Sequence, residues 1–193
     1  MDIVLASASP RRRELLARIV PSFRIAASGV DESSVPETDP VRFAMTAAEW
    51  KARAAGAADP GAIVIGADTV VALDGRIFGK PAGRAEARRM LGVLSGRIHR
   101  VITGVAFFHA ASGRLAVDRE ITPVTFRILT NEAIEAYLDR EDYADKAGAY
   151  AVQDVGDAFV AAIEGDYDNV VGFPLRLVAG MLSRFSTSPP SAP

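Results

Sequence analysis

The most hydrophobic run of the chain, residues 62–73, contains one charged residue, Asp68. Its length and composition are typical of a central β-strand, and the pair Asp74 and Gly75 is a typical turn after such a strand. A carboxylate inside a buried strand is costly unless it is paired, hydrogen-bonded or bound to a metal ion. Asp68 is therefore either a catalytic or metal-binding residue, or a structural carboxylate that accepts hydrogen bonds from loop amides.

A strand followed by a helix is also predicted at the N-terminus. Residues 3–5 are an apolar run, and Ser9 and Pro10 are a typical N-cap and first residue of a helix. Residues 11–13, all arginine, then fall in the first helical turn, where the helix dipole favours acidic side chains. This arrangement suits a bound anion such as phosphate. The alternative is a solvated helix face, because at most two of these three side chains can point at one ligand.

The composition argues against several classes of protein. With 193 residues and 49% apolar content, the chain can form a packed core, and its net charge of -2 provides no general attraction for a polynucleotide. The absence of Cys and the presence of only two His argue against a disulfide framework, a thiolate nucleophile and a histidine metal cluster. The sequence shows neither a secretory signal nor an apolar run long enough to span a bilayer. We expect a cytoplasmic protein without polynucleotide or membrane partners.

Apolar periodicity divides the rest of the chain into further elements. We expect helices over residues 41–55, 84–94, 130–138 and a final helix ending near residue 185. We expect strands over residues 23–27, 99–109, 115–129 and 159–163, and a polar turn over residues 164–169. The two long strands are predicted to form an antiparallel hairpin through Ser112 and Gly113. Residues 1–185 are predicted to be one domain, and residues 186–193, rich in Ser and Pro, a disordered tail.

Two lysines accompany the central strand. Lys51 lies in the predicted helix over residues 41–55, and helix propensity alone would leave it solvated. Lys80 lies between Gly79 and Pro81, on a constrained loop shortly after the strand. The spacing of this loop does not fit a Walker motif, which requires four residues between its glycines and Ser or Thr after the lysine.

Six short motifs of small, basic and acidic residues occur in order along almost the whole chain. They are Ser7-Ala8-Ser9-Pro10-Arg11-Arg12, Gly66-Ala67-Asp68-Thr69, Gly79-Lys80-Pro81, Leu94-Ser95-Gly96, Lys146-Ala147-Gly148-Ala149-Tyr150 and Val171-Gly172-Phe173-Pro174-Leu175. Together they resemble the Maf family of nucleoside triphosphate pyrophosphatases. The resemblance implies an α/β fold of the Maf/ITPase-like kind, in which a long mixed β-sheet is flanked by helices and two lobes surround a nucleotide-binding cleft.

The resemblance also implies roles for individual residues. Asp68, Lys80 and Lys51 resemble the catalytic residues of the family, and Glu32 with Asp68 its metal ligands. The residues that resemble its phosphate site are Ser7, Ser9, Arg11, Arg12 and Arg13. Hydrolysis of a phosphoanhydride needs charge neutralisation, an attacking water and a proton acceptor, which these residue types can supply. With only carboxylate oxygens available, the expected cofactor is Mg²⁺ or Mn²⁺. The sequence leaves open whether Asp68 is the base or a metal ligand.

The dTTP/UTP-specific subgroup of the family has a characteristic combination of residues at three positions, and this chain resembles it at Arg11, Thr69 and Gln153. The subgroup resembling enzymes for 7-methylated GTP tends to have Trp and an acidic residue at the positions of Arg11 and Gln153. The implied reaction converts dTTP, UTP and modified pyrimidine nucleotides to the monophosphate and pyrophosphate. Alternatives are a sanitising pyrophosphatase for 7-methyl-GTP or deaminated purine nucleotides, and a nucleotide-binding regulator of septum formation. A homodimer is left open.

Overall fold

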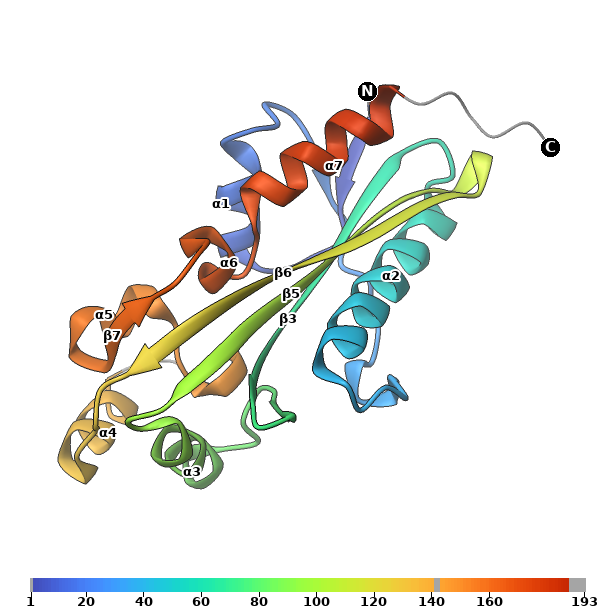
Figure 1. Cartoon of the computed structure of the whole chain (residues 1–193). Helices are drawn as coiled ribbons and strands as arrows, with labels where there is room; N and C mark the ends of the chain where they lie inside the picture. Colours follow the sequence, from blue (N-terminus) through green and yellow to red (C-terminus); the bar gives the residue numbers. More distant parts are fainter. Residues whose placement is uncertain (1, 141–142, 188–193) are drawn as a thin grey trace.

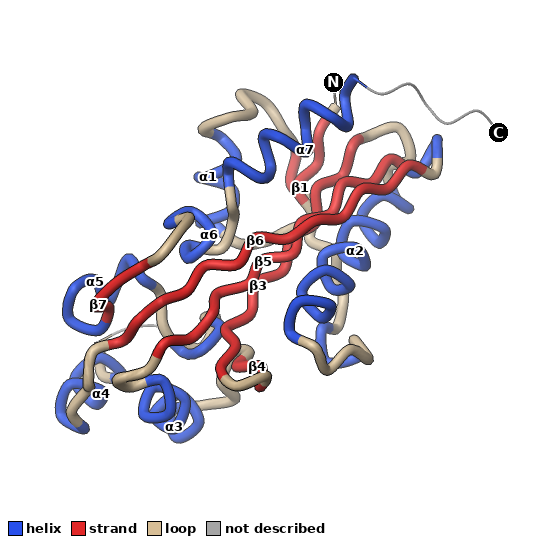
Figure 2. The backbone as a smooth tube through the Cα atoms, in the orientation of Figure 1, coloured by secondary structure: helices blue, strands red, loops and turns tan. Residues whose placement is uncertain are grey.

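The computed structural model describes residues 2–140 and 143–187. Within these ranges the chain folds into one seven-stranded β-sheet with helices on both faces (Figure 1, Figure 2). The strands are β1 (Ile3–Leu5), β2 (Arg24–Ile25), β3 (Ile63–Leu73), β4 (Arg76–Phe78), β5 (Ile98–His109), β6 (Arg114–Phe126) and β7 (Val160–Ile163). The helices are α1 (Pro10–Ala17), α2 (Pro40–Ala58), α3 (Arg84–Leu94), α4 (Asn131–Leu138), α5 (Val152–Phe159), α6 (Tyr167–Val171) and α7 (Leu175–Thr187).

The sheet is mixed, with the strand order β2-β1-β3-β5-β6-β7 and with β4 beside β3. β1 runs parallel to β2 and β3, whereas β3, β5, β6 and β7 are antiparallel neighbours. This confirms the predicted α/β fold with a long mixed sheet. The hairpin of β5 and β6 turns through Ala110–Ser112 and Gly113, whose φ of 67° is the left-handed conformation that glycine adopts without strain.

The two edges of β3 are paired differently. One edge pairs with β5 over residues 64–72. The other edge pairs with β1 over residues 63–65 and with β4 over residues 71–73. Between them, no described strand covers this edge at residues 66–70, a stretch we call the open interval. Asp68 lies at its centre.

Helix α2 packs directly on the middle of the sheet because two glycines remove the side chains that would hold it away. A Cβ atom on Gly66 would lie 2.2 Å from the carbonyl oxygen of Ala48, and one on Gly104 would lie 2.2 Å from that of Ala44. Any larger residue at either position would have to displace the backbone of α2. This close approach buries the face of α2 that carries Lys51, which is 7% exposed.

Two hydrophobic clusters lie toward opposite ends of the sheet (Figure 1). At one end, α1 and α7 pack on β1, β3 and β5 through side chains that include Leu16, Phe107 and Val178. At the other end, α3, α4 and α5 pack around β5 and β6 through side chains that include Leu91 and Phe126. The sheet therefore connects two lobes.

Some predicted boundaries differ from the observed elements. β2 contains only Arg24–Ile25 of the predicted strand over residues 23–27, and β6 ends at Phe126. Helix α7 continues to Thr187, so the first two residues of the predicted tail are helical. The rest of that tail, residues 188–193, lies outside the described residues.

Helices α5 and α6 were not predicted. α6 occupies part of the predicted polar turn and is too short to show an apolar period. Its signals are local, because the side chain of Asp166 caps it by accepting a hydrogen bond from the N–H of Asn169 at 3.2 Å, and Gly172 ends it with a φ of 115°. In the described part of the chain, no helix combines the length and apolarity needed to cross a membrane.

Candidate active site

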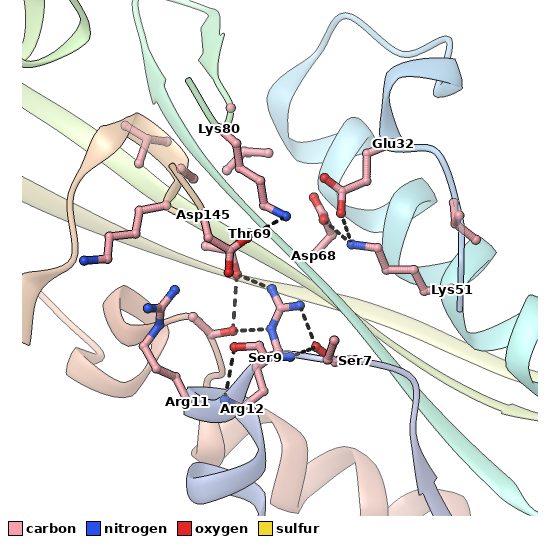
Figure 3. Close-up of a pocket in the computed structure, with 18 of the residues that line it drawn as sticks. Ser7, Ser9, Arg11, Arg12, Glu32, Lys51, Asp68, Thr69, Lys80 and Asp145 are labelled. Atoms are coloured by element: carbon pink, nitrogen blue, oxygen red, sulfur yellow. Dashed lines mark hydrogen bonds and ion pairs between the residues drawn. The ribbon is translucent and has the colours of Figure 1, made fainter. Parts of the chain in front are cut away.

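A cavity of about 710 Å³ lies beside the open interval of β3. Its walls come from both lobes: the loop from β1 into α1, residues 27–33, α2, the loop after β4, residues 145–151 and the end of α6. Figure 3 shows that the acidic and basic side chains of these segments converge on one region. The predicted site residues that line the cavity are Ser7, Ser9, Arg11, Arg12, Glu32, Lys51, Asp68, Thr69 and Lys80.

Lys51 joins the two predicted metal ligands. Its Nζ donates hydrogen bonds to Oδ1 of Asp68 at 2.6 Å and to Oε1 of Glu32 at 2.5 Å. The side chains of Lys51 and Asp68 are 9% and 5% exposed, whereas that of Glu32 is 36% exposed. The expectation from propensity that Lys51 is solvated is therefore wrong, because the glycines beneath α2 bring this lysine into the core.

The electrostatics of Glu32 reflect this arrangement. Partial burial acts to raise its pKa, but the charge and hydrogen bond of Lys51, with smaller effects of Lys80 and Arg12, outweigh burial. The pKa of Glu32 therefore lies below its ordinary value, and this carboxylate is ionised at neutral pH. Lys51 thus lies between two carboxylates and donates a hydrogen bond to each.

Glu32 and Asp68 are oxygen donors of the kind that Mg²⁺ and Mn²⁺ prefer. Within the described ranges, no group of three or more His, Cys, Asp or Glu side chains is arranged to hold a metal ion. A pair of carboxylates still fits Mg²⁺, since this ion usually retains several waters and takes further oxygens from substrate phosphates. The donor set therefore suits a divalent metal that binds together with a phosphorylated ligand.

The guanidinium of Arg12 donates hydrogen bonds to four acceptors within the protein. Its Nη1 donates to the carbonyl oxygen of Ala67 at 2.8 Å and to Oγ of Ser7 at 3.4 Å. Its Nη2 donates to Oγ1 of Thr69 at 3.0 Å (Figure 3). Its Nε donates to the carbonyl oxygen of Gly172 at 3.0 Å. Burial lowers the pKa of Arg12, against the opposing effect of the nearby carboxylates.

The start of α1 forms as predicted. The Oγ of Ser9 accepts a hydrogen bond from the N–H of Arg12 at 3.5 Å, and the Oγ of Ser7 accepts one from the N–H of Ser9 at 3.2 Å. Arg11 lines the cavity beside them, but Arg13 is exposed and does not line it. Two of the three consecutive arginines thus face the cavity, which is the limit that helical geometry sets.

Lys80 lies at the rim of the cavity, where its Nζ is 3.1 Å from Oδ1 of Asp145. The side chains of this pair are 53% and 68% exposed. The N–H of Gly148 donates to the carbonyl oxygen of Gly79 at 3.0 Å and ties the two loops of the rim together.

Sequence reasoning did not identify Asp145 and Lys146 as site residues, although both line the cavity. Lys146 is only 8% exposed and is paired with Asp154. The signal available in the sequence was the motif that begins at Lys146. Gln153 is exposed in the first turn of α5 and is not among the residues that line the cavity, whereas Ala151 is.

Comparison with known proteins gives a consistent result. The chain matches the family described as "Maf-like protein" over residues 2–185. The dTTP/UTP pyrophosphatase of Moorella thermoacetica is 51% identical over 183 residues, which are 95% of this chain and 94% of that protein. The dTTP/UTP pyrophosphatase of Deinococcus radiodurans is 47% identical over 180 residues, which are 93% of this chain and 91% of that protein.

Two solved structures share the fold at low sequence identity. A HAM1 protein from Coxiella burnetii aligns with a TM-score of 0.53 and 17% identity, over 95% of this chain and 99% of that chain. The Ham1 protein of Staphylococcus aureus aligns with a TM-score of 0.53 and 13% identity, over 96% of this chain and 98% of that chain. The family match and the identity to relatives over nearly the whole length show that the chain belongs to the Maf family.

Proposed function

We propose that the chain is a pyrophosphatase that hydrolyses dTTP and UTP to the nucleoside monophosphate and pyrophosphate. The observation that carries the proposal is the bridge of Lys51 between Asp68 and Glu32 at the open interval of β3. The cavity beside it lies within the usual size range of small-molecule sites, roughly 300–1,000 Å³. The names of the related dTTP/UTP pyrophosphatases support the same substrates.

The cations and hydroxyls of the cavity suit a triphosphate. Arg11 and Lys80, which both line the cavity, supply positive charge, and the hydroxyls of Ser7 and Ser9 lie at the N-terminus of α1, where the helix dipole favours an anion. The pair of Lys80 with Asp145 is exposed, and such pairs contribute only about 0–1 kcal/mol. Lys80 can therefore exchange this carboxylate for a phosphate oxygen at little cost.

In the proposed reaction, water attacks the α-phosphorus and the bond from this phosphorus to the bridging oxygen breaks, so that pyrophosphate leaves. Asp68 accepts the proton of the water or holds the metal ion, and the hydrogen bond from Lys51 keeps its carboxylate oriented. Glu32 and Asp68 would hold Mg²⁺ or Mn²⁺, which supplies charge neutralisation and acidifies bound water. We propose that base specificity is determined by Thr69, Arg11 and Gln153.

Recognition of the base by Gln153 requires its exposed side chain to turn toward the cavity, and the position of Ala151 in the cavity wall supports this. The amide can pair with the N3–H and O4 edge of uracil or thymine, since it offers one donor and one acceptor. A cytoplasmic location, the absence of polynucleotide and membrane partners, and a homodimer remain predictions.

One assay tests the proposed function. The purified protein is incubated with dTTP, UTP, CTP, 7-methyl-GTP and a deaminated purine triphosphate, each with Mg²⁺ or Mn²⁺, and the products are identified by mass. We expect monophosphate and pyrophosphate from dTTP and UTP, and no turnover without metal. Release of inorganic phosphate would overturn the cleavage site, and a preference for a purine nucleotide would overturn the substrate. Binding without turnover would favour the regulator.

A further inference from the structure

At the open interval around Asp68, no described strand pairs with the edge of β3 that faces away from β5. Unpaired strand edges expose N–H and C=O groups, and segments with few backbone partners open more readily than paired ones. A carboxylate that must meet a substrate in one geometry needs a rigid support. Some other group must therefore replace the missing strand at residues 66–70.

Arg12 occupies this position. Its two terminal nitrogens bind the residues immediately before and after Asp68, namely the carbonyl oxygen of Ala67 at 2.8 Å and Oγ1 of Thr69 at 3.0 Å. Neighbouring side chains of a strand point to opposite faces, so Thr69 points away from Asp68. Arg12 thus holds the strand through the carbonyl oxygen of Ala67 and the side chain of Thr69. On the face opposite Thr69, Nζ of Lys51 holds Oδ1 of Asp68 at 2.6 Å.

The remaining bonds of Arg12 anchor it to two other segments. Its Nε donates to the carbonyl oxygen of Gly172 at 3.0 Å, and its Nη1 also donates to Oγ of Ser7 at 3.4 Å. Thr69 reinforces the connection, because its Oγ1 lies 3.2 Å from the same carbonyl oxygen of Gly172 and 3.0 Å from Oγ1 of Thr103. Arg12 therefore connects the loop after β1, the open interval and the end of α6.

We infer that Arg12 is a positioning residue that replaces a β-strand beside Asp68, rather than a ligand of the substrate's phosphates. A guanidinium has five N–H donors, and these four hydrogen bonds use four of them on protein acceptors. A phosphate ligand would instead turn its paired N–H groups toward the phosphate. Arg11, which precedes it and also lines the cavity, remains available for that role. The inference rests on the proposed function for the reaction that Asp68 serves.

The first test replaces each arginine by lysine, which keeps the charge but not the planar fork. We expect Arg12→Lys to lower kcat for UTP by roughly a hundredfold and to change KM by less than about threefold. Arg11→Lys should raise KM more than it lowers kcat. Arg89→Lys, on the exposed surface of α3, is the control and should change neither. A kcat of Arg12→Lys within about threefold of the unchanged protein would overturn the inference.

A second test asks whether shape or charge is required. Arg12→Ala is assayed with guanidinium or methylammonium added at equal concentration. We expect guanidinium to restore kcat at least about tenfold, because it can rebuild the planar contacts to Ala67 and Gly172, and methylammonium to restore little. Equal rescue by both ions would show that only charge matters and would overturn the inference.

A double-mutant cycle replaces this test if circular dichroism shows that Arg12→Ala does not fold. The cycle combines Thr69→Val with Arg12→Lys, and additive losses of kcat in the double variant would overturn the inference.

A binding measurement separates this inference from the proposed function. Calorimetry with pyrophosphate and Mg²⁺ should give an affinity for Arg12→Lys within about threefold of the unchanged protein, while Arg11→Ala binds at least about tenfold more weakly. A loss in Arg12→Lys as large as that in Arg11→Ala would make Arg12 a phosphate ligand. If the unchanged protein hydrolysed neither dTTP nor UTP, the proposed function would fail, and the pyrophosphate affinities would still decide the role of Arg12.

Discussion

Two parts of the cavity each contain a lysine paired with an aspartate. We call them the floor, at Lys51 and Asp68, and the rim, at Lys80 and Asp145, and the two pairs differ in burial. On the floor, the side chains of Lys51 and Asp68 are 9% and 5% exposed. At the rim, those of Lys80 and Asp145 are 53% and 68% exposed. Breaking a buried pair by removing one partner typically costs about 3–5 kcal/mol, whereas exposed pairs contribute about 0–1 kcal/mol. The same residue types thus give a fixed charge arrangement on the floor and an exchangeable one at the rim.

The difference comes from the elements that carry the lysines. Lys51 lies on a long helix that the glycines at positions 66 and 104 allow to touch the sheet. Lys80 lies on a loop that leaves the sheet after β4. We infer that the floor sets the geometry of the reaction and that the rim adapts to the phosphates of the substrate.

The largest effect on activity is expected from a change at Asp68, on the floor of the cavity. Asp68→Asn should lower kcat for UTP and dTTP by roughly 10²- to 10⁴-fold, the usual consequence of losing a general base, while the isosteric amide lets the fold survive. Steady-state kinetics measures kcat, and circular dichroism shows whether the fold survives. Activity close to normal would remove Asp68 from the mechanism, and loss of the fold would make it a structural carboxylate.

The second prediction compares the stabilities of floor and rim. Lys51→Met leaves Asp68 as a buried charge without its partner and should reduce the free energy of unfolding by about 3–5 kcal/mol. Lys80→Met is the matched variant at the rim and should change it by less than about 1 kcal/mol. Urea unfolding at neutral pH measures both. Equal effects of the two variants would remove the distinction between floor and rim.

The pH dependence of Lys51→Met follows from Glu32. Because the pKa of Glu32 is depressed in the folded protein, its contribution to stability is present above its unfolded pKa and is lost as the pH falls through its folded value. Removing Lys51 removes the main cause of this depression. The loss of stability between neutral and acidic pH should therefore be smaller in Lys51→Met than in the unchanged protein.

The third prediction asks whether the outer part of the site takes part in recognising the base. Gln153→Glu sets an acceptor against O4 of uracil or thymine, and should lower kcat/KM for dTTP and UTP roughly ten- to two-hundredfold relative to 7-methyl-GTP. Kinetics with dTTP, UTP, CTP and 7-methyl-GTP on both proteins measures the ratios. Unchanged ratios would mean that Gln153 stays exposed, as it is here, and does not read the base.

The smallest effect is expected from Asp145→Asn, which frees Lys80 of its exposed partner. KM for UTP should fall by up to about threefold without a change in kcat, because Lys80 no longer has to leave a carboxylate to meet a phosphate. Raising the salt concentration should reduce the difference, since exposed charges are screened. A large fall in kcat would instead give Asp145 a direct part in the reaction.

The sequence predicted those features that have local signals. The start of α1 follows from Ser9 and Pro10, and the need of Asp68 for a partner follows from the apolar run around it. Lys51 could not be identified as that partner without family resemblance, because its burial depends on Gly66 and Gly104, which are distant in sequence.

The role of Arg12 was also beyond sequence reasoning. Two of its four acceptors are backbone carbonyl oxygens, which every residue has and which therefore leave no pattern in the sequence. α6 escaped prediction for a related reason, since a single helical turn has no periodicity.

The pairing of β3 has a consequence for hydrogen exchange. Ile63 and Ile65 direct their backbone groups toward β1, so by alternation Ala67 and Thr69 direct theirs toward the open interval, while Asp68 directs its own toward β5. The amide of Asp68 should thus exchange as slowly as the core, as should that of Ala67, which is fully buried, whereas that of Thr69, which lines the cavity, should exchange faster until a nucleotide covers it. One fast amide between slow neighbours on a central strand, slowed by UTP, would be an activity-independent signature of where the substrate lies.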